Sequence, residues 1–416
     1  MSKIEVEGMR RLQGEVRIQG SKNAALPILS ACVLNRGETV LHRCPKIGDV
    51  SSMLDALKGA GAKITWQKDT LILDTSVMEP EPFIEKAGKL RSSVMLLGSF
   101  LARFGRAVIG YPGGCCIGKR PIDLHEQCLN AMGAVFCEEE HYLEARCRKL
   151  EGCDLFLPYP SVGVTENVIL AACGAAGMTR IYGAAKEPEV AELCRFLTVL
   201  GIRINGIGTD TVTVMGGTPA TAAEYTICSD RIVAGTYLMA AAAAGGEIVL
   251  KDAPLEHMRY PLQMMGKLGA ELFRDGRNIK MKMKDFVKPV PYICTAPYPG
   301  FPTDLQSPLL AVLCKAKGPS RIEERIFENR FLIVEELEKM GAGIRVEGQT
   351  AFVCPVERLG PAAMTAKDLR GGAALVIAAL EAEGVSVIEN AQIIFRGYEH
   401  LEKDLQALGA NISTIS

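Results

Sequence analysis

The pattern that decides the fold is clearest in the stretch Ile232-Val233-Ala234-Gly235-Thr236-Tyr237-Leu238-Met239-Ala240-Ala241-Ala242-Ala243-Ala244-Gly245-Gly246-Glu247-Ile248-Val249-Leu250. Residues 232–244 are apolar or small nearly all round, as in a helix that is buried on every side. Gly245 and Gly246 suit the end of such a helix, and the apolar run after them is typical of a strand. We therefore predict a buried helix followed by a strand.

The same order of small-residue helix, glycine and strand recurs along the chain. The other buried helices are expected at Asn23–Leu34, Ser92–Phe104, Thr165–Ala176, Leu305–Lys315 and Gly371–Leu380. A second kind of helix, amphipathic and ending at a glycine, precedes breaks at Gly61, Gly133, Gly201, Gly269, Gly341 and Gly409. These breaks are 72, 68, 68, 72 and 68 residues apart, and such regular spacing indicates an internal repeat.

Each repeat is expected to consist of a buried helix, a strand, an outer helix with one polar face, and a β-hairpin. The outer helices include Met53–Gly59 and Val334–Met340, and the clearest hairpin joins Lys63–Trp66 to Thr70–Leu73. The N-terminal strands Lys3–Glu7 and Gly14–Gln19 are expected to complete the sixth repeat, because only one strand is evident after Gly409.

Six repeats divide most simply into two α/β domains of three repeats each. The turn residues Gly216-Gly217-Thr218-Pro219 interrupt the pattern and mark the change of domain. We predict a first domain at 22–229 and a second domain made of 1–21 and 230–416, so that the chain crosses between them twice.

Composition excludes several classes of partner. The 416 residues are 48% hydrophobic and 23% charged, with a net charge of −1, so we expect no nucleic-acid partner and only a few local cations for any phosphate ligand. The absence of an apolar signal core or an 18-residue apolar run predicts a cytoplasmic protein without membrane insertion. Nothing in the sequence identifies a protein partner.

Cysteine and histidine usage argues against disulfides and metals. Most of the 14 cysteines are expected to be reduced, buried small hydrophobic residues in apolar stretches, as at Cys173, Cys228, Cys314 and Cys354. No C-x-x-C occurs and the five histidines lie far apart, so neither a metal nor a cofactor is expected.

One glycine-rich loop gathers a thiol, two cations and a carboxylate. It reads Tyr111-Pro112-Gly113-Gly114-Cys115-Cys116-Ile117-Gly118-Lys119-Arg120-Pro121-Ile122-Asp123-Leu124-His125. Such a loop can close over a ligand, and cations favour the thiolate of a neighbouring cysteine. Two alternatives are a surface turn with incidental cysteines and a nucleotide-triphosphate loop. The second lacks the Ser or Thr hydroxyl for magnesium, because Arg120 stands in its place.

Polar residues gather at the N-terminal ends of the buried helices. These ends are expected at Lys22-Asn23, Arg91-Ser92, the Ser161-Val162-Gly163 turn before Thr165, Asp230-Arg231, Thr303-Asp304 and Asp368-Leu369-Arg370. Ordinary capping accounts for the acids and hydroxyls. It does not account for cations at the positive end of a helix, so we predict that these ends bind anions.

The repeats, the start Ser21-Lys22-Asn23-Ala24-Ala25-Leu26-Pro27 and the loop Pro112-Gly113-Gly114-Cys115 together resemble the UDP-N-acetylglucosamine 1-carboxyvinyltransferase family over essentially the whole chain. The resemblance implies two inside-out α/β barrel domains with the active site in the cleft between them. It also implies transfer of the enolpyruvyl group of phosphoenolpyruvate to the 3′-hydroxyl of UDP-N-acetylglucosamine, the first committed step of peptidoglycan precursor synthesis, with release of phosphate.

The resemblance implies a role for individual residues. Phosphoenolpyruvate would be bound by the cations Lys22, Arg91, Arg120 and Arg396, which suit its phosphate and carboxylate. Cys115 would donate a proton to the methylene carbon, form a phospholactoyl adduct, and be alkylated by fosfomycin. Asp304 would lie beside the 3′-hydroxyl as the base.

The remaining implied contacts concern the nucleotide sugar. They are Asn23 and Asp304 at the sugar; Arg120, Pro121, Ile122, Asp123 and Leu124 at the uridine; Ser161, Val162 and Gly163 at the diphosphate; Ile326 and Phe327 at the sugar and uracil end; and Arg330, Asp368, Leu369 and Arg370 in the catalytic cleft. The sequence departs from the family at Phe395, where many members have an acid, and at Tyr159, where some have a lysine.

Two other functions compete with this one. A sister enzyme acting on 3-phosphoshikimate, 3-phosphoshikimate 1-carboxyvinyltransferase, would share the repeats and the cations, but the Pro-Gly-Gly-Cys loop favours the UDP-sugar branch. A non-catalytic UDP-sugar-binding regulatory paralogue would be favoured only by Phe395, and the joint presence of Lys22, Cys115, Asp304 and Arg396 argues against it.

Overall fold

The chain folds into two compact units, each with its own buried core. The computed structural model describes residues 2–79, 91–110, 121–140, 142–218, 220–284 and 286–415. Among these, residues 20–110 and 121–228 form the first unit, and residues 2–19 and 229–415 form the second. The chain therefore passes from one unit to the other at 19/20 and again at 228/229.

The first unit is built around three buried helices, α1 (Lys22–Cys32), α4 (Leu96–Phe104) and α6 (Val162–Gly174), which contact one another. The outer helices are α2 (Gly48–Gly59), α5 (Asp123–Ala131) and α7 (Pro188–Val199). The strands are β3 (Glu38–His42), β4 (Lys63–Gln67), β5 (Thr70–Asp74), β6 (Arg106–Gly110), β7 (Val135–Glu138), β8 (Tyr142–Arg146), β9 (Asp154–Phe156), β10 (Met178–Tyr182), β11 (Arg203–Asn205), β12 (Thr211–Met215) and β13 (Ala223–Thr226).

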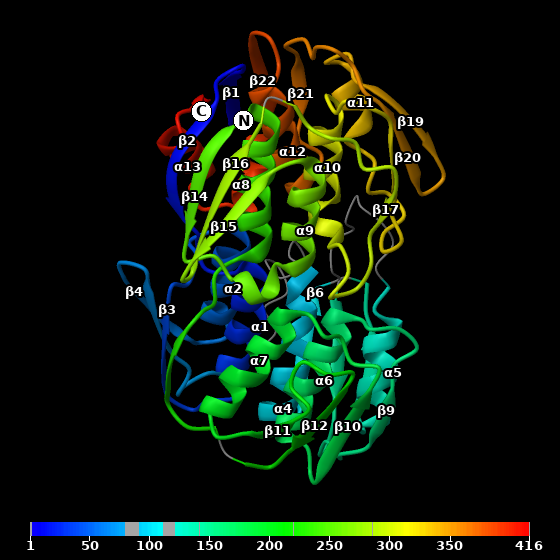
Figure 1. The fold of residues 1–416 in the computed structure, drawn as a ribbon. Helices are drawn as coiled ribbons and strands as arrows, with labels where there is room; N and C mark the ends of the chain where they lie inside the picture. Colours follow the sequence, from blue (N-terminus) through cyan, green and yellow to red (C-terminus); the bar gives the residue numbers. More distant parts are fainter. Residues whose placement is uncertain are drawn as a thin grey trace. The chain divides into compact units, whose positions relative to one another are not determined.

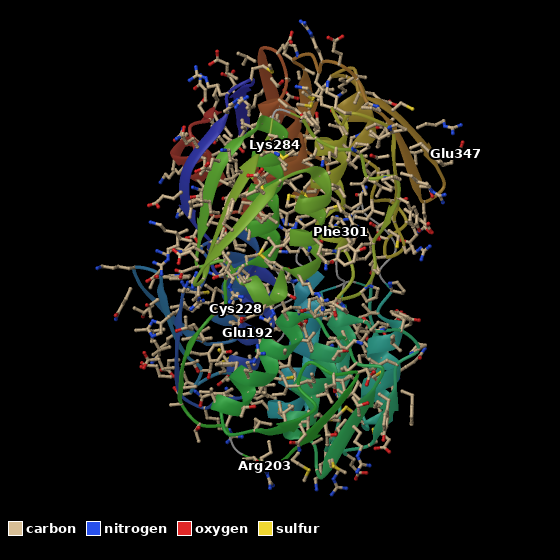
Figure 2. All side chains as sticks on the ribbon, in the orientation of Figure 1. Glu192, Arg203, Cys228, Lys284, Phe301 and Glu347 are labelled. Atoms are coloured by element: carbon tan, nitrogen blue, oxygen red, sulfur yellow. The ribbon has the colours of Figure 1, made fainter. Side chains whose placement is uncertain are left out.

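The second unit repeats this plan with the buried helices α8 (Arg231–Ala244), α10 (Gln306–Leu313) and α12 (Leu369–Leu380), which lie side by side inside the sheets in Figure 1. Its outer helices are α9 (Arg259–Leu268), α11 (Val334–Glu338) and α13 (Leu401–Ala407). The strands are β1 (Lys3–Glu7), β2 (Leu12–Arg17), β14 (Gly246–Lys251), β15 (Glu271–Asp275), β16 (Asn278–Met283), β17 (Ile293–Cys294), β18 (Ser320–Glu323), β19 (Gly343–Glu347), β20 (Thr350–Cys354), β21 (Ala363–Thr365), β22 (Val385–Glu389) and β23 (Asn411–Ile415).

In the part of the chain that the structure describes, three sheets surround the helices of each unit. In the first unit the strand orders are β13-β3-β5-β4, β11-β12-β10-β9 and, among the described residues, β6-β8-β7. In the second unit they are β21-β22-β1-β23, β15-β16-β14-β2 and β17-β18-β20-β19. Helices inside and sheets outside confirm the inside-out α/β architecture. The predicted hairpin is also confirmed, since β4 and β5 pair antiparallel with Thr65 opposite Ile72.

The predicted repeat lacked one strand, which precedes the buried helix and runs parallel to the strand after that helix. Within single repeats, β9 pairs with β10, β17 with β18, and β21 with β22. These strands are only two or three residues long, so a pattern of alternating hydrophobicity could not show them.

The prediction that both N-terminal strands complete the sixth repeat was half wrong. Strand β1 does lie between β22 and β23, with Ile4 opposite Ile388 and Thr414. Strand β2 instead pairs parallel with β14 of the fourth repeat, and β13, at the end of the first unit, pairs parallel with β3 of the first repeat. In each unit, the last strand before the chain crosses to the other unit thus pairs with a strand of its own unit.

Burial agrees with most of the predicted pattern. Every residue of α8 from Arg231 to Ala242 is buried, and Gly245 ends the helix at a φ of 73°. The predicted polar outer face is wrong for α7, which packs on α1 and buries Glu189 and Glu192. Cys354 was also predicted to be buried, but it is exposed at the end of β20, whereas Cys173 and Cys314 are buried.

The twelve described cysteines are free thiols, of which six are buried. Within the described ranges, no helix combines the length and the apolarity that crossing a membrane requires.

Candidate functional site

Two arginines hold the carboxylate of Asp304 in the second unit. Arg330 donates from Nη2 to Oδ1 at 2.7 Å, and Arg370 donates from Nε to Oδ2 at 3.2 Å. Nη2 of Arg370 lies 3.1 Å from the same Oδ2 without hydrogen-bond geometry. Both arginine side chains are nearly fully buried, whereas the Asp304 side chain is 26% exposed. The arrangement therefore presents an oriented carboxylate, backed by fixed cations, to a ligand that arrives from solvent.

The start of α12 fixes the two other predicted cleft residues. Asp368 is the N-cap of this helix, and its Oδ1 accepts from the backbone N–H groups of Arg370 at 3.0 Å and Gly371 at 2.9 Å. The same oxygen lies 3.5 Å from Nη1 of Arg330. Leu369 is the first residue of the helix and is partly buried. The cap that starts α12 therefore also aligns the guanidinium groups at Asp304.

Arg370 is charged at any physiological pH, although it is buried. Burial by itself would lower the pKa of Arg370, but its neighbours Tyr398, Asp304 and Asp230 raise that pKa above the ordinary value. Its guanidinium lies 5.3 Å from the ring centre of Tyr398, whose hydroxyl is 2.8 Å from Oγ1 of Thr236. Burial in turn raises the pKa of the Tyr398 hydroxyl. The cation thus lies close to both a carboxylate and an aromatic ring.

Glu324, which the sequence analysis missed, connects Asp304 to Ile326 and Phe327. Its Oε1 accepts from the backbone N–H groups of Ile326 at 2.8 Å and Phe327 at 3.1 Å. Its Oε2 accepts from the hydroxyl of Thr303 at 3.0 Å, next to Asp304 in the chain. Glu324 is fully buried, and an acid directly after a predicted strand gave no signal of this role.

Arg396 and its neighbour Phe395 differ in their exposure to solvent. Arg396 is exposed at the end of the 3₁₀ helix η4 (Ala391–Arg396), whereas Phe395 packs against the core. The departure from the family at position 395 is therefore an apolar contact that anchors η4.

In the first unit, Lys22 is held by a residue that the sequence analysis missed. Nζ of Lys22 lies 3.0 Å from Oδ2 of Asp49, in the first turn of α2, and the two side chains are 14% and 6% exposed. Ser21 caps α1 and Asn23 is its second residue. The cation at the positive end of α1 is thus stabilised by a carboxylate from another helix. An acid in the first turn of a helix is so ordinary that the sequence did not distinguish Asp49.

The predicted uridine and diphosphate segments also belong to the first unit. Pro121 and Asp123 are exposed, Ile122 is partly buried, and Leu124 is buried at the start of α5. Ser161 caps α6 through a contact of 3.4 Å from the N–H of Val164, so Val162 and Gly163 form the first turn of that helix. Tyr159, the second departure from the family, is 55% exposed, and its carbonyl accepts from the N–H of Ser161.

Cys115 and Arg120 lie outside the described residues, as does the side chain of Arg91, whose backbone begins the 3₁₀ helix η1 (Arg91–Met95). In the part of the chain that the structure describes, no group of three or more His, Cys, Asp or Glu side chains is arranged to hold a metal ion.

Comparison with known proteins identifies the family. The chain is 44% identical over 416 residues to UDP-N-acetylglucosamine 1-carboxyvinyltransferase 2 of Caldanaerobacter subterraneus, with all of both chains covered. It is 40% identical to the UDP-N-acetylglucosamine 1-carboxyvinyltransferase of Halothermothrix orenii, again over all of both chains. The chain belongs to the UDP-N-acetylglucosamine 1-carboxyvinyltransferase family.

The wider group of enolpyruvyl transferases shares its fold. The family model for EPSP synthase (3-phosphoshikimate 1-carboxyvinyltransferase) matches residues 6–405. The enolpyruvyl transferase NikO from Streptomyces tendae superposes with a TM-score of 0.88 at 22% identity, covering 100% of this chain and 99% of that one. An EPSP synthase from Acinetobacter baumannii reaches 0.78 at 17% identity, with both chains fully covered. These structural likenesses establish the fold of this family member.

Proposed function

We propose that this protein transfers the enolpyruvyl group of phosphoenolpyruvate to the 3′-hydroxyl of UDP-N-acetylglucosamine, with release of phosphate, as the first committed step of peptidoglycan precursor synthesis. The observation that carries the proposal is the full-length identity of 44% to an enzyme named for this reaction. The EPSP synthase structures are only 17% and 18% identical, which disfavours the 3-phosphoshikimate alternative.

In this proposal Asp304 is the base. Its carboxylate takes the proton of the sugar 3′-hydroxyl while the oxygen bonds to C2 of phosphoenolpyruvate, and the methylene carbon gains a proton from Cys115. Loss of phosphate from C2 and of a proton from the methyl group then restores the double bond. Arg330 and Arg370 support this role because they orient Asp304 and require no movement during the reaction.

The other assigned residues bind the two substrates. Lys22, Arg91, Arg120 and Arg396 would neutralise the phosphate and carboxylate of phosphoenolpyruvate. Asn23 would contact the sugar, Pro121 to Leu124 the uridine, and Ser161 to Gly163 the diphosphate at the N-terminus of α6, where free N–H groups favour an anion. Ile326 and Phe327 would contact the sugar and uracil end.

The test is phosphate release with both substrates and with each one omitted. Phosphate is expected only when phosphoenolpyruvate and UDP-N-acetylglucosamine are present together. Turnover with 3-phosphoshikimate in place of the nucleotide sugar would assign the protein to the sister branch. A folded preparation that binds the nucleotide sugar without any turnover would instead favour the regulatory paralogue.

We further propose that fosfomycin alkylates Cys115, because this small phosphonate epoxide resembles phosphoenolpyruvate in charge and size and Cys115 is flanked by cations and glycines in the sequence. Peptide mass mapping should find the adduct on Cys115, faster with UDP-N-acetylglucosamine present, and not on Cys116. Alkylation that persists in Cys115→Ser would contradict the assignment.

A further inference from the structure

Asn167 is the last of three consecutive buried polar residues, after Thr165 and Glu166, in a helix that is apolar beyond them. It lies in α6, has no exposed surface, and is followed by Val168, Ile169 and Leu170. A buried amide is costly unless its polar atoms are hydrogen-bonded, so its partners indicate why it stands there.

The amide of Asn167 joins three elements of the first unit. Its Oδ1 accepts from the backbone N–H of Gly98 at 2.7 Å, and its Nδ2 donates to the carbonyl of Val94 at 3.0 Å. Nδ2 also lies 3.0 Å from Nδ1 of His125. A backbone N–H can only donate and a carbonyl can only accept, so these two partners fix which end of the amide is oxygen and which is nitrogen.

This orientation determines the tautomer of His125. Because the nitrogen of Asn167 faces Nδ1, that ring nitrogen must accept, and the proton of the neutral imidazole is on Nε2. His125 is 7% exposed. A Cβ placed on Gly163 would lie 3.5 Å from both Cε1 and Nε2 of this ring. The protonated edge of His125 therefore lies against Gly163.

Asn167 ties α6 to α4, η1 and α5, and three of these four elements, η1, α5 and α6, also carry assigned substrate contacts. Val94 belongs to η1, which begins at Arg91. His125 follows directly after the Pro121 to Leu124 segment, and Asn167 lies one turn beyond the Ser161 to Gly163 turn. A displaced amide at position 167 would therefore move all three segments relative to one another.

We propose that Asn167 is a positioning residue for the nucleotide sugar: it fixes His125 as the Nε2–H tautomer against Gly163 and holds the uridine and diphosphate segments in register with η1. The proposal rests on the proposed function, because the ligand is taken to be UDP-N-acetylglucosamine. If Asn167 has this role, replacing it should raise the dissociation constant of the nucleotide sugar by more than a general loss of stability would.

The main test compares Asn167→Asp with Asn35→Asp by calorimetric titration of UDP-N-acetylglucosamine. Asn35 is a matched control because it is also a buried asparagine of the first unit, and its amide donates to the carbonyl of Glu38 and to Oγ1 of Thr39. In Asn167→Asp a carboxylate would face the Val94 carbonyl and Nδ1 of His125, so we expect Kd to rise on the order of tenfold or more. Asn35→Asp should leave Kd unchanged.

A second measurement does not depend on any variant or substrate. The ¹⁵N spectrum of the histidine rings in the wild-type protein should show His125 protonated at Nε2 alone at neutral pH. Protonation at Nδ1, or an imidazolium ring, would overturn the proposal. If Asn167→Asp does not fold, His125→Phe removes the acceptor while leaving the Asn167 bonds to Gly98 and Val94, and should raise Kd in the same way.

The outcomes separate this proposal from the proposed function. Wild-type phosphate release decides the function by itself. Normal turnover, combined with a Kd that Asn167→Asp and His125→Phe raise no more than Asn35→Asp does, would reject the positioning role and leave the function intact.

Discussion

At the scale of single residues, the assigned site depends on ion pairs between separate elements. Lys22 and Arg370 lie at the N-terminal ends of helices, where their charge is unfavourable. The structure pairs each with a carboxylate from elsewhere in the chain, Asp49 and Asp304 respectively. Breaking one partner of such a buried pair leaves an uncompensated charge, so these positions should tolerate little substitution.

The residue-scale prediction concerns Asp304→Asn. The amide keeps the size of the side chain and one acceptor oxygen but cannot take a proton. We expect binding of UDP-N-acetylglucosamine to stay within roughly tenfold and turnover to fall by about 10²–10⁴. Calorimetry and steady-state rates on one preparation measure both, with Glu347→Gln on the exposed end of β19 as the control. Equal losses of binding and turnover would make Asp304 a binding residue only.

At the scale of elements, helix α6 also buries the ionisable side chain of Glu166, next to Asn167. It is 1% exposed, and its Oε1 has no hydrogen-bond partner among the described residues. Burial, with smaller contributions from Glu189 and Glu187, raises the pKa of Glu166 well above its ordinary value of 4.5. The folded protein therefore favours the protonated acid, whereas the unfolded chain ionises in the ordinary range. This contribution to stability is complete below pH 4.5 and is lost as the pH rises toward the raised pKa.

The element-scale prediction follows from that sign. Glu166→Gln, which is neutral at every pH, should raise the melting temperature relative to wild type at pH 8, by roughly 2–4 °C for each kcal/mol of relieved cost. The difference should shrink at pH 4.5, where the wild-type acid carries its proton in the folded state. Scanning calorimetry at both values measures it, and Glu151→Gln on an exposed side chain is the control. A pH-independent difference between the Gln variant and wild type would contradict the argument.

At the scale of the whole molecule, the second unit depends on the start of the chain. Strand β1 lies between β22 and β23, and β2 completes the sheet of β14. Without residues 1–19 the sheet of β22 loses an inner strand, and β14, which still pairs with β16, becomes an exposed edge strand. The first unit has no such need, because its strand β13 precedes the second crossing.

This asymmetry gives the third prediction. A fragment of residues 20–228 should fold and unfold cooperatively by itself, whereas 229–416 alone should not fold. Joining residue 416 to residue 1 through a short linker, to give 229–416 followed by 1–19, should restore folding, since Lys3 already lies opposite Ile415. Circular dichroism and thermal melts of the three chains measure this. Cooperative melting of unassisted 229–416 would show that β1 and β2 are dispensable.

The sequence by itself determined the repeat, the buried helices and the polar residues at their ends. Such features are local: a helix buried on all sides must be apolar along its whole length, as residues 232–244 are, and a cation at its N-terminus is visible as an exception. The resemblance to a known family then supplied the proposed roles of Asp304, Arg330 and Arg370. In the structure both arginines donate hydrogen bonds to the Asp304 carboxylate.

Only the tertiary structure decided which distant residues meet. Asp49, Glu324 and Asn167 look ordinary in the sequence, because an acid in a first helical turn or a single amide in a helix has many uses. Their roles come from partners that lie 27, 21 and 42 residues away in the chain, at Lys22, Thr303 and His125. The partner of β2 was also undecidable, since a six-residue strand can satisfy its backbone groups on any open edge. In the structure β2 pairs with β14, the first strand that the chain forms after it returns to the second unit.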